Sequence, residues 1–132
     1  MKSPIIILLL VAACATAHAQ DPVTTSAQYY KVLLENDQVR VVQCRLKPGE
    51  KEPMHSYPAG VGYVASGAKA TFTYPDGRSG DKAASTGEAI WREPTTDAVE
   101  NIGDTETNVI AVDLKIARRT ETSTAEQVLW DL

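Results

Sequence analysis

Short runs of apolar and β-branched residues, separated by turn residues, recur along the chain between residues 29 and 116. Runs of this length and spacing are typical of the strands of an all-β sandwich or barrel. No stretch before residue 120 repeats its apolar residues with helical periodicity. The pattern therefore predicts strands over residues 29–34, 39–46, 61–66, 68–74, 89–91, 98–101 and 109–116.

Turn residues separate these runs. Lys47-Pro48-Gly49 closes the second strand, Gly67 joins the third to the fourth, and Pro75-Asp76-Gly77 is the strongest turn signal of the sequence. The run 109–116 is apolar on both faces near its start, which predicts a central strand.

The two ends of the chain have different patterns. Ser123-x-x-Glu126 and Thr124-x-x-Gln127 are capping boxes ahead of Val128 and Trp130, and they predict a short C-terminal helix of one or two turns. At the other end, residues 1–19 are typical of a secretory signal peptide, with a positive start, an apolar core over residues 5–13 and Ala17-His18-Ala19 as the cleavage site.

Cleavage after this site makes Gln20 the first residue of a periplasmic or secreted protein. The alternative is a membrane-anchored lipoprotein, because Val11-Ala12-Ala13-Cys14 has the order at which such proteins are cut and lipidated. The apolar core is too short to cross a bilayer as a helix. No transmembrane helix is therefore expected.

The remaining residues, 20–132, have the length of one domain, and no repeat or linker divides them. The net charge is −4 and the sequence has no run of basic residues that could bind a phosphate backbone, so nucleic acid is not an expected partner.

Cys44 shares a strand face with Val42 and Leu46, which predicts a buried, unreactive thiol.

Two motifs along residues 40–115 give this strand pattern a family resemblance. The first contains Gly49, then His55-Ser-Tyr57, then Gly60 and Gly67; the second runs from Gly87-Glu-Ala-Ile-Trp91 to Asp97-Ala-Val-Glu-Asn101. In this order and spacing the chain resembles a small single-domain cupin of the exported bacterial type. The resemblance implies a jelly-roll barrel, also called a double-stranded β-helix, with its core motifs within residues 39–116 and a central cavity. Since many cupins are dimers, it also implies a possible homodimer.

The metal motif of the family is degenerate in this chain. Metal-binding cupins use two histidines and a glutamate from the first motif and a histidine from the second. In this chain His55 stands at the first histidine position and Tyr57 at the second. The glutamate position falls on Gly60 or Val61, and Asp97 stands at the histidine position of the second motif.

One imidazole, one carboxylate and a neutral phenol make a poor cage for a divalent metal. His55 is the only histidine after residue 19, so we expect no cofactor; any divalent metal would have to bind His55 and Asp97. Glu50 and Glu52 lie near enough in sequence to supplement such a site, but they precede His55 in a proline-flanked loop and are expected to face solvent.

These residues leave several functions open. The first is a metal-independent binding protein whose pocket is lined by His55, Tyr57 and Asp97, with Trp91 as an apolar wall. The alternatives are a metal-dependent or histidine-based enzyme of the isomerase, lyase or oxygenase kind, and a fold-only assembly protein. A purely structural role for the three polar residues also stays open. Sugars, phenolic compounds and organic acids suit such a pocket equally well.

Overall fold

The computed structural model describes residues 21–115, and Ala68 within them only by its backbone. This part of the chain contains one short helix and a series of antiparallel strands. In chain order they are α1 (Pro22–Thr25), β1 (Tyr30–Glu35), β2 (Val39–Leu46), β3 (Lys51–Tyr57), β4 (Gly60–Ser66), β5 (Ala68–Thr73), β6 (Ser79–Ala84), β7 (Ala89–Arg92), β8 (Thr95–Asn101) and β9 (Thr107–Leu114). The predicted signal peptide and C-terminal helix lie outside the described residues.

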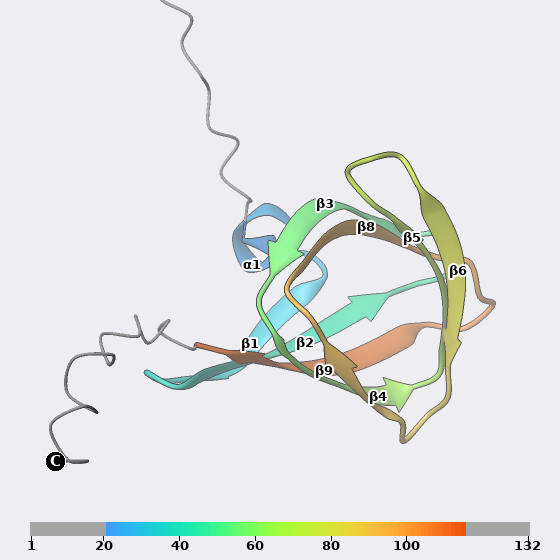
Figure 1. Ribbon diagram of the computed structural model, residues 1–132. Helices are drawn as coiled ribbons and strands as arrows, with labels where there is room; N and C mark the ends of the chain where they lie inside the picture. The colour runs from blue at the N-terminus through green and yellow to red at the C-terminus, as the bar shows by residue number, and fades with distance from the viewer. Residues whose placement is uncertain (1–20, 116–132) are drawn as a thin grey trace, which may run out of the picture.

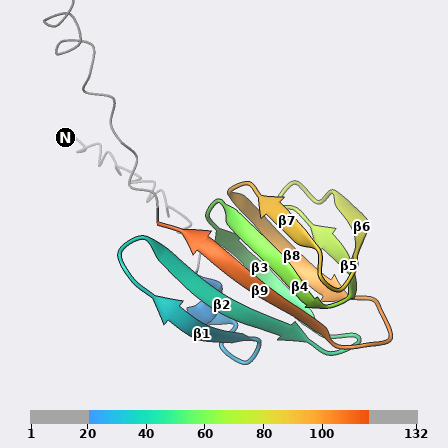
Figure 2. The ribbon, with the colours of Figure 1, turned by 90° about the horizontal axis from the view of Figure 1, so that it is seen from below.

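The strands form two sheets that face each other (Figure 1). One sheet has five strands in the order β1-β2-β9-β4-β7, which Figure 2 shows side by side, and the other has four in the order β3-β8-β5-β6. The expected jelly-roll architecture is thus confirmed. The run 109–116 falls on β9, the central strand of the larger sheet, as its apolar pattern predicted.

All seven predicted strands are present, and β3 and β6 are additional. The turn at Pro75-Asp76-Gly77 forms the hairpin between β5 and β6, where Gly77 has a φ of 85°. Gly67 lies at the point where the chain leaves one sheet at the end of β4 and enters the other at β5.

The barrel is hollow, because its most buried apolar side chains surround a cavity. Five of the six most buried apolar residues line this space: Val42, Leu46, Val64, Ala70 and Ala111. Since these side chains are mostly small, the two sheets can face each other without filling the volume between them. Pro22 of α1 also lines the cavity, and α1 packs against β1 and β3 at the side of the barrel.

Strand β3 contains a β-bulge. Glu52 pairs with Val99 of β8 and His55 pairs with Asp97, so three residue steps along β3 match two along β8. The extra residue interrupts the alternation of side chains: Glu52 and His55 are both buried, while Pro53 and Met54 between them are both exposed. The bulge therefore turns the carboxyl and the imidazole into the barrel together.

Strand β4 approaches β9 closely at Gly60. A Cβ atom on Gly60 would overlap the carbonyl oxygen of Val112 and would also crowd the guanidinium of Arg92. At Gly62, two residues further, the nearest atom to an added Cβ is the Arg92 Cδ at 3.6 Å, an ordinary contact. The closest approach of the backbone is thus confined to Gly60.

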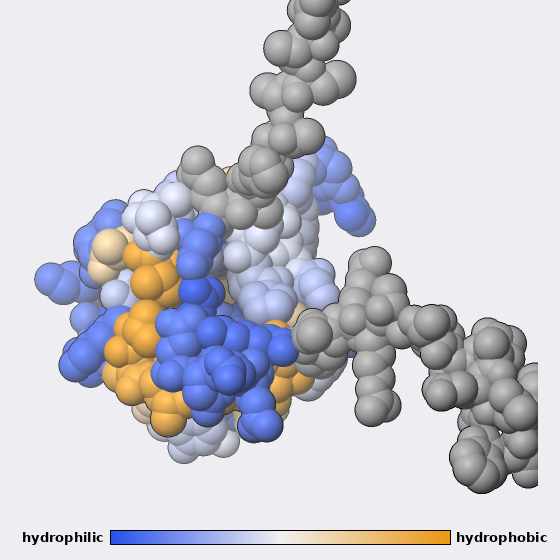
Figure 3. Space-filling model, turned by 90° about the vertical axis from the view of Figure 1, so that its left-hand side faces the viewer, coloured by the Kyte–Doolittle hydropathy of each residue, from blue (hydrophilic) through white to orange (hydrophobic). Residues whose placement is uncertain are grey.

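Several large apolar side chains reach the surface on the edge strand β1: Val32, Leu33 and Leu34. Figure 3 shows hydrophobic residues gathered around a hydrophilic group on the side of the molecule that faces left in Figure 1. Among residues 21–115, no helix is long and apolar enough to span a bilayer.

Candidate functional site

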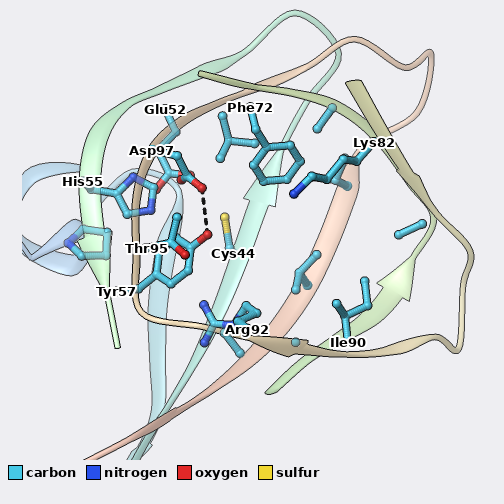
Figure 4. Close-up of a pocket in the computed structure, with 18 of the residues that line it drawn as sticks. Cys44, Glu52, His55, Tyr57, Phe72, Lys82, Ile90, Arg92, Thr95 and Asp97 are labelled. Atoms are coloured by element: carbon cyan, nitrogen blue, oxygen red, sulfur yellow. Dashed lines mark hydrogen bonds and ion pairs between the residues drawn. The ribbon is translucent and has the colours of Figure 1, made fainter. Parts of the chain in front are cut away.

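The barrel contains an open cavity of about 500 Å³ that is polar on one side and apolar on the other. The polar side is formed mainly by β3, β7 and β8, which contribute Glu52, His55, Tyr57, Arg92 and Asp97 (Figure 4). Apolar side chains form the other walls: Val42, Val64, Ala70, Phe72, Val99, Val109 and Ala111. A pocket of this size with a few convergent polar groups is typical of a small-molecule site.

His55 is fixed in the wall by its Nδ1 atom. This nitrogen lies 3.0 Å from the carbonyl oxygen of Pro53 and 3.2 Å from Oε1 of Glu52. Because a carbonyl oxygen only accepts, Nδ1 carries a proton and donates it to Pro53. The other nitrogen, Nε2, has no hydrogen bond to any described residue and is available to a molecule in the cavity.

Asp97 and Tyr57 form the second fixed group. The Tyr57 hydroxyl donates to Oδ2 of Asp97 over 2.8 Å, and the guanidinium carbon of Arg92 lies 4.7 Å from the centre of the Tyr57 ring. The cation covers a face of the phenol while the carboxylate binds its tip. The phenol is thus held at both its face and its hydroxyl.

Arg92 is itself anchored by a chain of ion pairs that leads to the outside of the barrel. Its Nη2 donates to Oδ1 of the buried Asp113 over 2.6 Å, and Arg40 approaches Oδ2 of the same carboxylate at 3.3 Å. Arg40 also pairs with Asp21, the N-cap of α1, over 2.6 Å. The chain links the first described residue to the polar wall of the cavity.

Two carboxyls of this wall are incompletely satisfied. Glu52 and Asp97 are each 1% exposed, and neither Oε1 of Glu52 nor Oδ1 of Asp97 has a hydrogen-bond partner of acceptable geometry among the described residues. Burial raises the pKa of both carboxyls, while His55 and Tyr30 oppose the rise at Glu52 and the Tyr57 hydrogen bond opposes it at Asp97. Both oxygens are enclosed by protein atoms.

Cys44 and Tyr30 complete the polar end beside Glu52. Burial raises the pKa of the Cys44 thiol to about 12, with a further contribution from Glu52, so the thiol stays protonated at neutral pH. Cys44 is partly buried and its side chain lines the cavity; that the thiol is unreactive stays a prediction. Burial likewise raises the pKa of Tyr30 above its usual range.

The structure brings three of the four predicted site residues together. His55, Tyr57 and Asp97 share the polar wall, whereas Trp91 lies at the rim, where its side chain is 55% exposed and its Nε1 donates to Glu93. The expectation that Glu52 faces solvent was wrong, because the β3 bulge turns it inward. Glu50 is only partly exposed, and its carboxylate accepts from the backbone NH of Lys47.

Arg92 and Lys82 also line the cavity and were not predicted. The sequence gives no signal for them, because lysine and arginine are common on protein surfaces. Only the positions of β6 and β7 in the fold show that these two side chains face the cavity.

Asn101, the end of the second motif, has a structural role. Its amide donates to the carbonyls of Leu46 and Thr105, and its Oδ1 accepts from Gly103.

The side chains at the family's metal positions do not fit a divalent metal ion. The Nε2 of His55 could bind a metal, but Tyr57 donates its proton to Asp97, Gly60 has no side chain, and Val61 points outward. Within residues 21–115 no three His, Cys, Asp or Glu side chains are grouped as a metal would require.

Comparison with known proteins supports the fold. No protein-family model and no curated protein matches the sequence. Among solved structures, a cupin domain from Bordetella pertussis Tohama I superposes with a TM-score of 0.61 and 24% identity, over 66% of this chain and 92% of that one.

Two further structures have the same architecture. A protein with a double-stranded β-helix domain from Klebsiella pneumoniae has a TM-score of 0.54 and 20% identity, over 65% of this chain and 75% of that one. An RmlC-like cupin family protein from Methanocaldococcus jannaschii has a TM-score of 0.51 and 17% identity, over 64% and 77%. Identities this low establish the fold and leave the ligand and activity to the site itself.

Proposed function

We propose that this small cupin-type domain binds a small organic molecule in its central cavity, without a metal ion. The observation that carries the proposal is the cavity of about 500 Å³, where His55, Tyr57, Arg92 and Asp97 converge on one wall and apolar side chains form the others. A pocket of this size with a few convergent polar groups is typical of a small-molecule site.

The geometry does not form the His55–Asp97 pair on which the catalytic alternative depended. A general base needs a group that orients its ring, and the sequence offered Asp97 for that role. Asp97 is instead bonded to Tyr57 through Oδ2, and the protonated nitrogen of His55 donates to the Pro53 carbonyl. We therefore assign His55 and Asp97 to ligand contact, as two separate groups in one wall.

The test combines metal analysis with ligand screening of the full chain. Protein purified without chelator is assayed for transition metals, and its melting temperature is then measured against a panel of sugars, phenolic compounds and organic acids. We expect substoichiometric metal and a rise in melting temperature with at least one compound. That rise should be lost in Asp97→Asn and kept in Asp104→Asn, an exposed control.

Two results would overturn the proposal. A stoichiometric metal that survives dialysis and is lost in His55→Ala would assign the site to metal chemistry. A panel that leaves the melting temperature of the wild-type protein unchanged would remove the reason to regard the cavity as a binding site.

A further inference from the structure

Two cationic side chains project into the cavity, one from each sheet. Lys82 of β6 is paired with Ala70, and Arg92 of β7 is paired with Gly60; both partners are buried in the barrel. Because directly paired residues of neighbouring strands point to the same face of a sheet, both cations face inward, as Figure 4 shows. Strands β6 and β7 are edge strands that follow each other in the chain, so the two cations lie on the same side of the barrel (Figure 2). His55 is the third basic residue that lines the cavity.

The Lys82 ammonium has hydrogen-bonding capacity to spare. Its Nζ lies 3.3 Å from the Tyr74 hydroxyl and 4.8 Å from the centre of the Phe72 ring. No acidic side chain of residues 21–115 forms an ion pair with it. Since an ammonium has three donors, Lys82 can bind the oxygen of a ligand in addition to Tyr74.

Arg92 occupies the space that two glycines of β4 leave free. A Cβ atom on Gly60 would lie 3.2 Å from its Nη2, and one on Gly62 would lie 3.6 Å from its Cδ. Nη2 donates to Asp113, whereas Nη1 has no hydrogen bond to any side chain or backbone group in the described part of the chain. The Arg92 side chain is 20% exposed, so this guanidinium is a second cation that a molecule in the cavity can reach.

The acidic side chains that line the cavity are enclosed or already bonded. Glu52 and Asp97 are each 1% exposed, and the oxygen of each that lacks a partner is covered by protein atoms. Asp113 is buried and bound by two arginines, and the carboxylate of Glu93 at the rim accepts a hydrogen bond from Trp91. The charged groups most open to a molecule inside the cavity are therefore positive.

The other walls favour a ligand with an apolar body. Val42, Val64, Val109 and Ala111 have no hydrogen-bonding atom in their side chains, so a ligand that is polar all round would leave polar groups unpaired against them. An aromatic ring or a branched hydrocarbon gains by leaving water for such a surface. A cavity of about 500 Å³ has room for such a body and one charged group.

We propose that the ligand is an organic anion, a carboxylate on an aromatic or branched apolar body, whose charged group binds Lys82 and faces Arg92. This inference rests on the proposed function and narrows it. The ligand supplies the acidic partner that Lys82 lacks among the described residues. Burial raises the pKa of Asp97, and the charges of Lys82 and Arg92 both oppose that rise, so the field of the two cations reaches the polar wall.

The experiment is calorimetric titration of the metal-free full chain at neutral pH with three compounds of one shape: benzoate, benzamide and benzamidine, which are anionic, neutral and cationic. Acetate, the fourth probe, has the carboxylate without the apolar body. We expect benzoate to bind about tenfold more tightly than benzamide, because a hydrogen bond to a charged group is stronger than one between neutral groups by about that factor. Benzamidine and acetate should both bind more weakly than benzoate. Added salt should weaken the binding of benzoate and leave that of benzamide unchanged.

Variants then locate the contact. Lys82→Gln should reduce the preference for benzoate over benzamide several-fold, and Lys82→Arg, which keeps the charge, should retain it. Lys69→Gln is the matched control, because Lys69 is an exposed lysine of the neighbouring strand β5 that precedes the inward-facing Ala70. Lys82 is exposed on an edge strand, so its variants are expected to fold, and the order of the four wild-type affinities tests the ligand class without any variant.

The possible failures are distinguishable. Binding of benzamide, benzamidine or acetate that equals or exceeds that of benzoate would overturn the ligand class and keep the proposed function. A preference for benzoate that is the same in Lys82→Gln and the wild type would overturn the contact with Lys82. Binding of a compound of the wider panel by a protein that binds none of the four probes would overturn this inference alone. Absence of binding by the four probes and by the wider panel would overturn both inferences.

Discussion

Tyr57 connects the two charged parts of the polar wall, because its ring contacts Arg92 and its hydroxyl binds Asp97. We predict that Tyr57→Phe raises the pKa of Asp97, since the Tyr57 hydrogen bond opposes the effect of burial on that carboxyl. The variant should also lower the free energy of unfolding by about 1–2 kcal/mol. Carbon-13 NMR titration of the carboxyl and urea unfolding measure the two effects. Tyr63→Phe, on an exposed tyrosine, is the control.

An unchanged pKa of Asp97 in Tyr57→Phe would show that the hydroxyl does not stabilise the carboxylate in solution. A shift of the same size in Tyr63→Phe would show that the effect is not specific to the site.

The raised pKa values of Glu52 and Asp97 predict how stability depends on pH. In the unfolded chain these carboxyls titrate near their ordinary values of 4.5 and 3.8, and in the folded protein they release their protons at higher pH. Between the pKa values of the unfolded and the folded chain, the folded state holds more protons than the unfolded state, so the free energy of unfolding falls as the pH rises through this interval. The stabilising contribution of the two carboxyls is complete below their pKa values in the unfolded chain and lost above their pKa values in the folded protein.

Urea unfolding at a series of pH values above about pH 4 measures this dependence. The double variant with Glu52→Gln and Asp97→Asn should flatten the fall in unfolding free energy over that interval. An identical slope in the wild type and the double variant would contradict the assignment.

At the level of strands, the close approach of β4 to β9 makes Gly60 the position least tolerant of substitution. We predict that Gly60→Ala lowers the free energy of unfolding by about 1–3 kcal/mol or prevents folding, because its Cβ would overlap the Val112 carbonyl oxygen. Gly62→Ala, where the nearest atom is 3.6 Å away, is the matched control and should be tolerated. Urea unfolding compares the two, and equal losses would contradict the prediction.

The sequence pattern predicts the strands that carry their own apolar residues and misses the two that do not. Strand β6, with the sequence Ser-Gly-Asp-Lys-Ala-Ala, is an edge strand of small and polar residues, and pairing with β5 defines it. Strand β3 contains Pro53 and charged residues, and its pairing with β8 is likewise invisible in the pattern. Backbone pairing between distant segments thus limits what local sequence can predict.

The bulge in β3 explains why the sequence predicted only some of the residues that line the polar wall. The motif spacing located His55, Tyr57 and Asp97 because those positions are set by the strand register. Regular alternation from His55 along β3 would direct Glu52 outward, and only the bulge reverses this. A one-residue irregularity in the backbone therefore separates the predicted set of cavity residues from the set that the structure places there.

At the scale of the whole molecule, export is a prediction about residues outside the described range. We expect intact-mass spectrometry of protein from the periplasmic or extracellular fraction to give a chain that begins at Gln20. A diacylglyceryl group on Cys14 would instead identify a lipoprotein. Retention of Met1 in the mature protein would contradict both forms of the prediction.

The close packing at Gly60 limits which metal ligands substitution could introduce into this barrel. Tyr57 and Asp97 could each become histidine by one substitution, but the glutamate position of the family motif falls on Gly60 or Val61. No side chain fits at Gly60 beneath the Val112 carbonyl, and Val61 points out of the barrel. A chain with this backbone cannot acquire the four-ligand set by point substitutions at those positions alone. It would first have to move β4 away from β9.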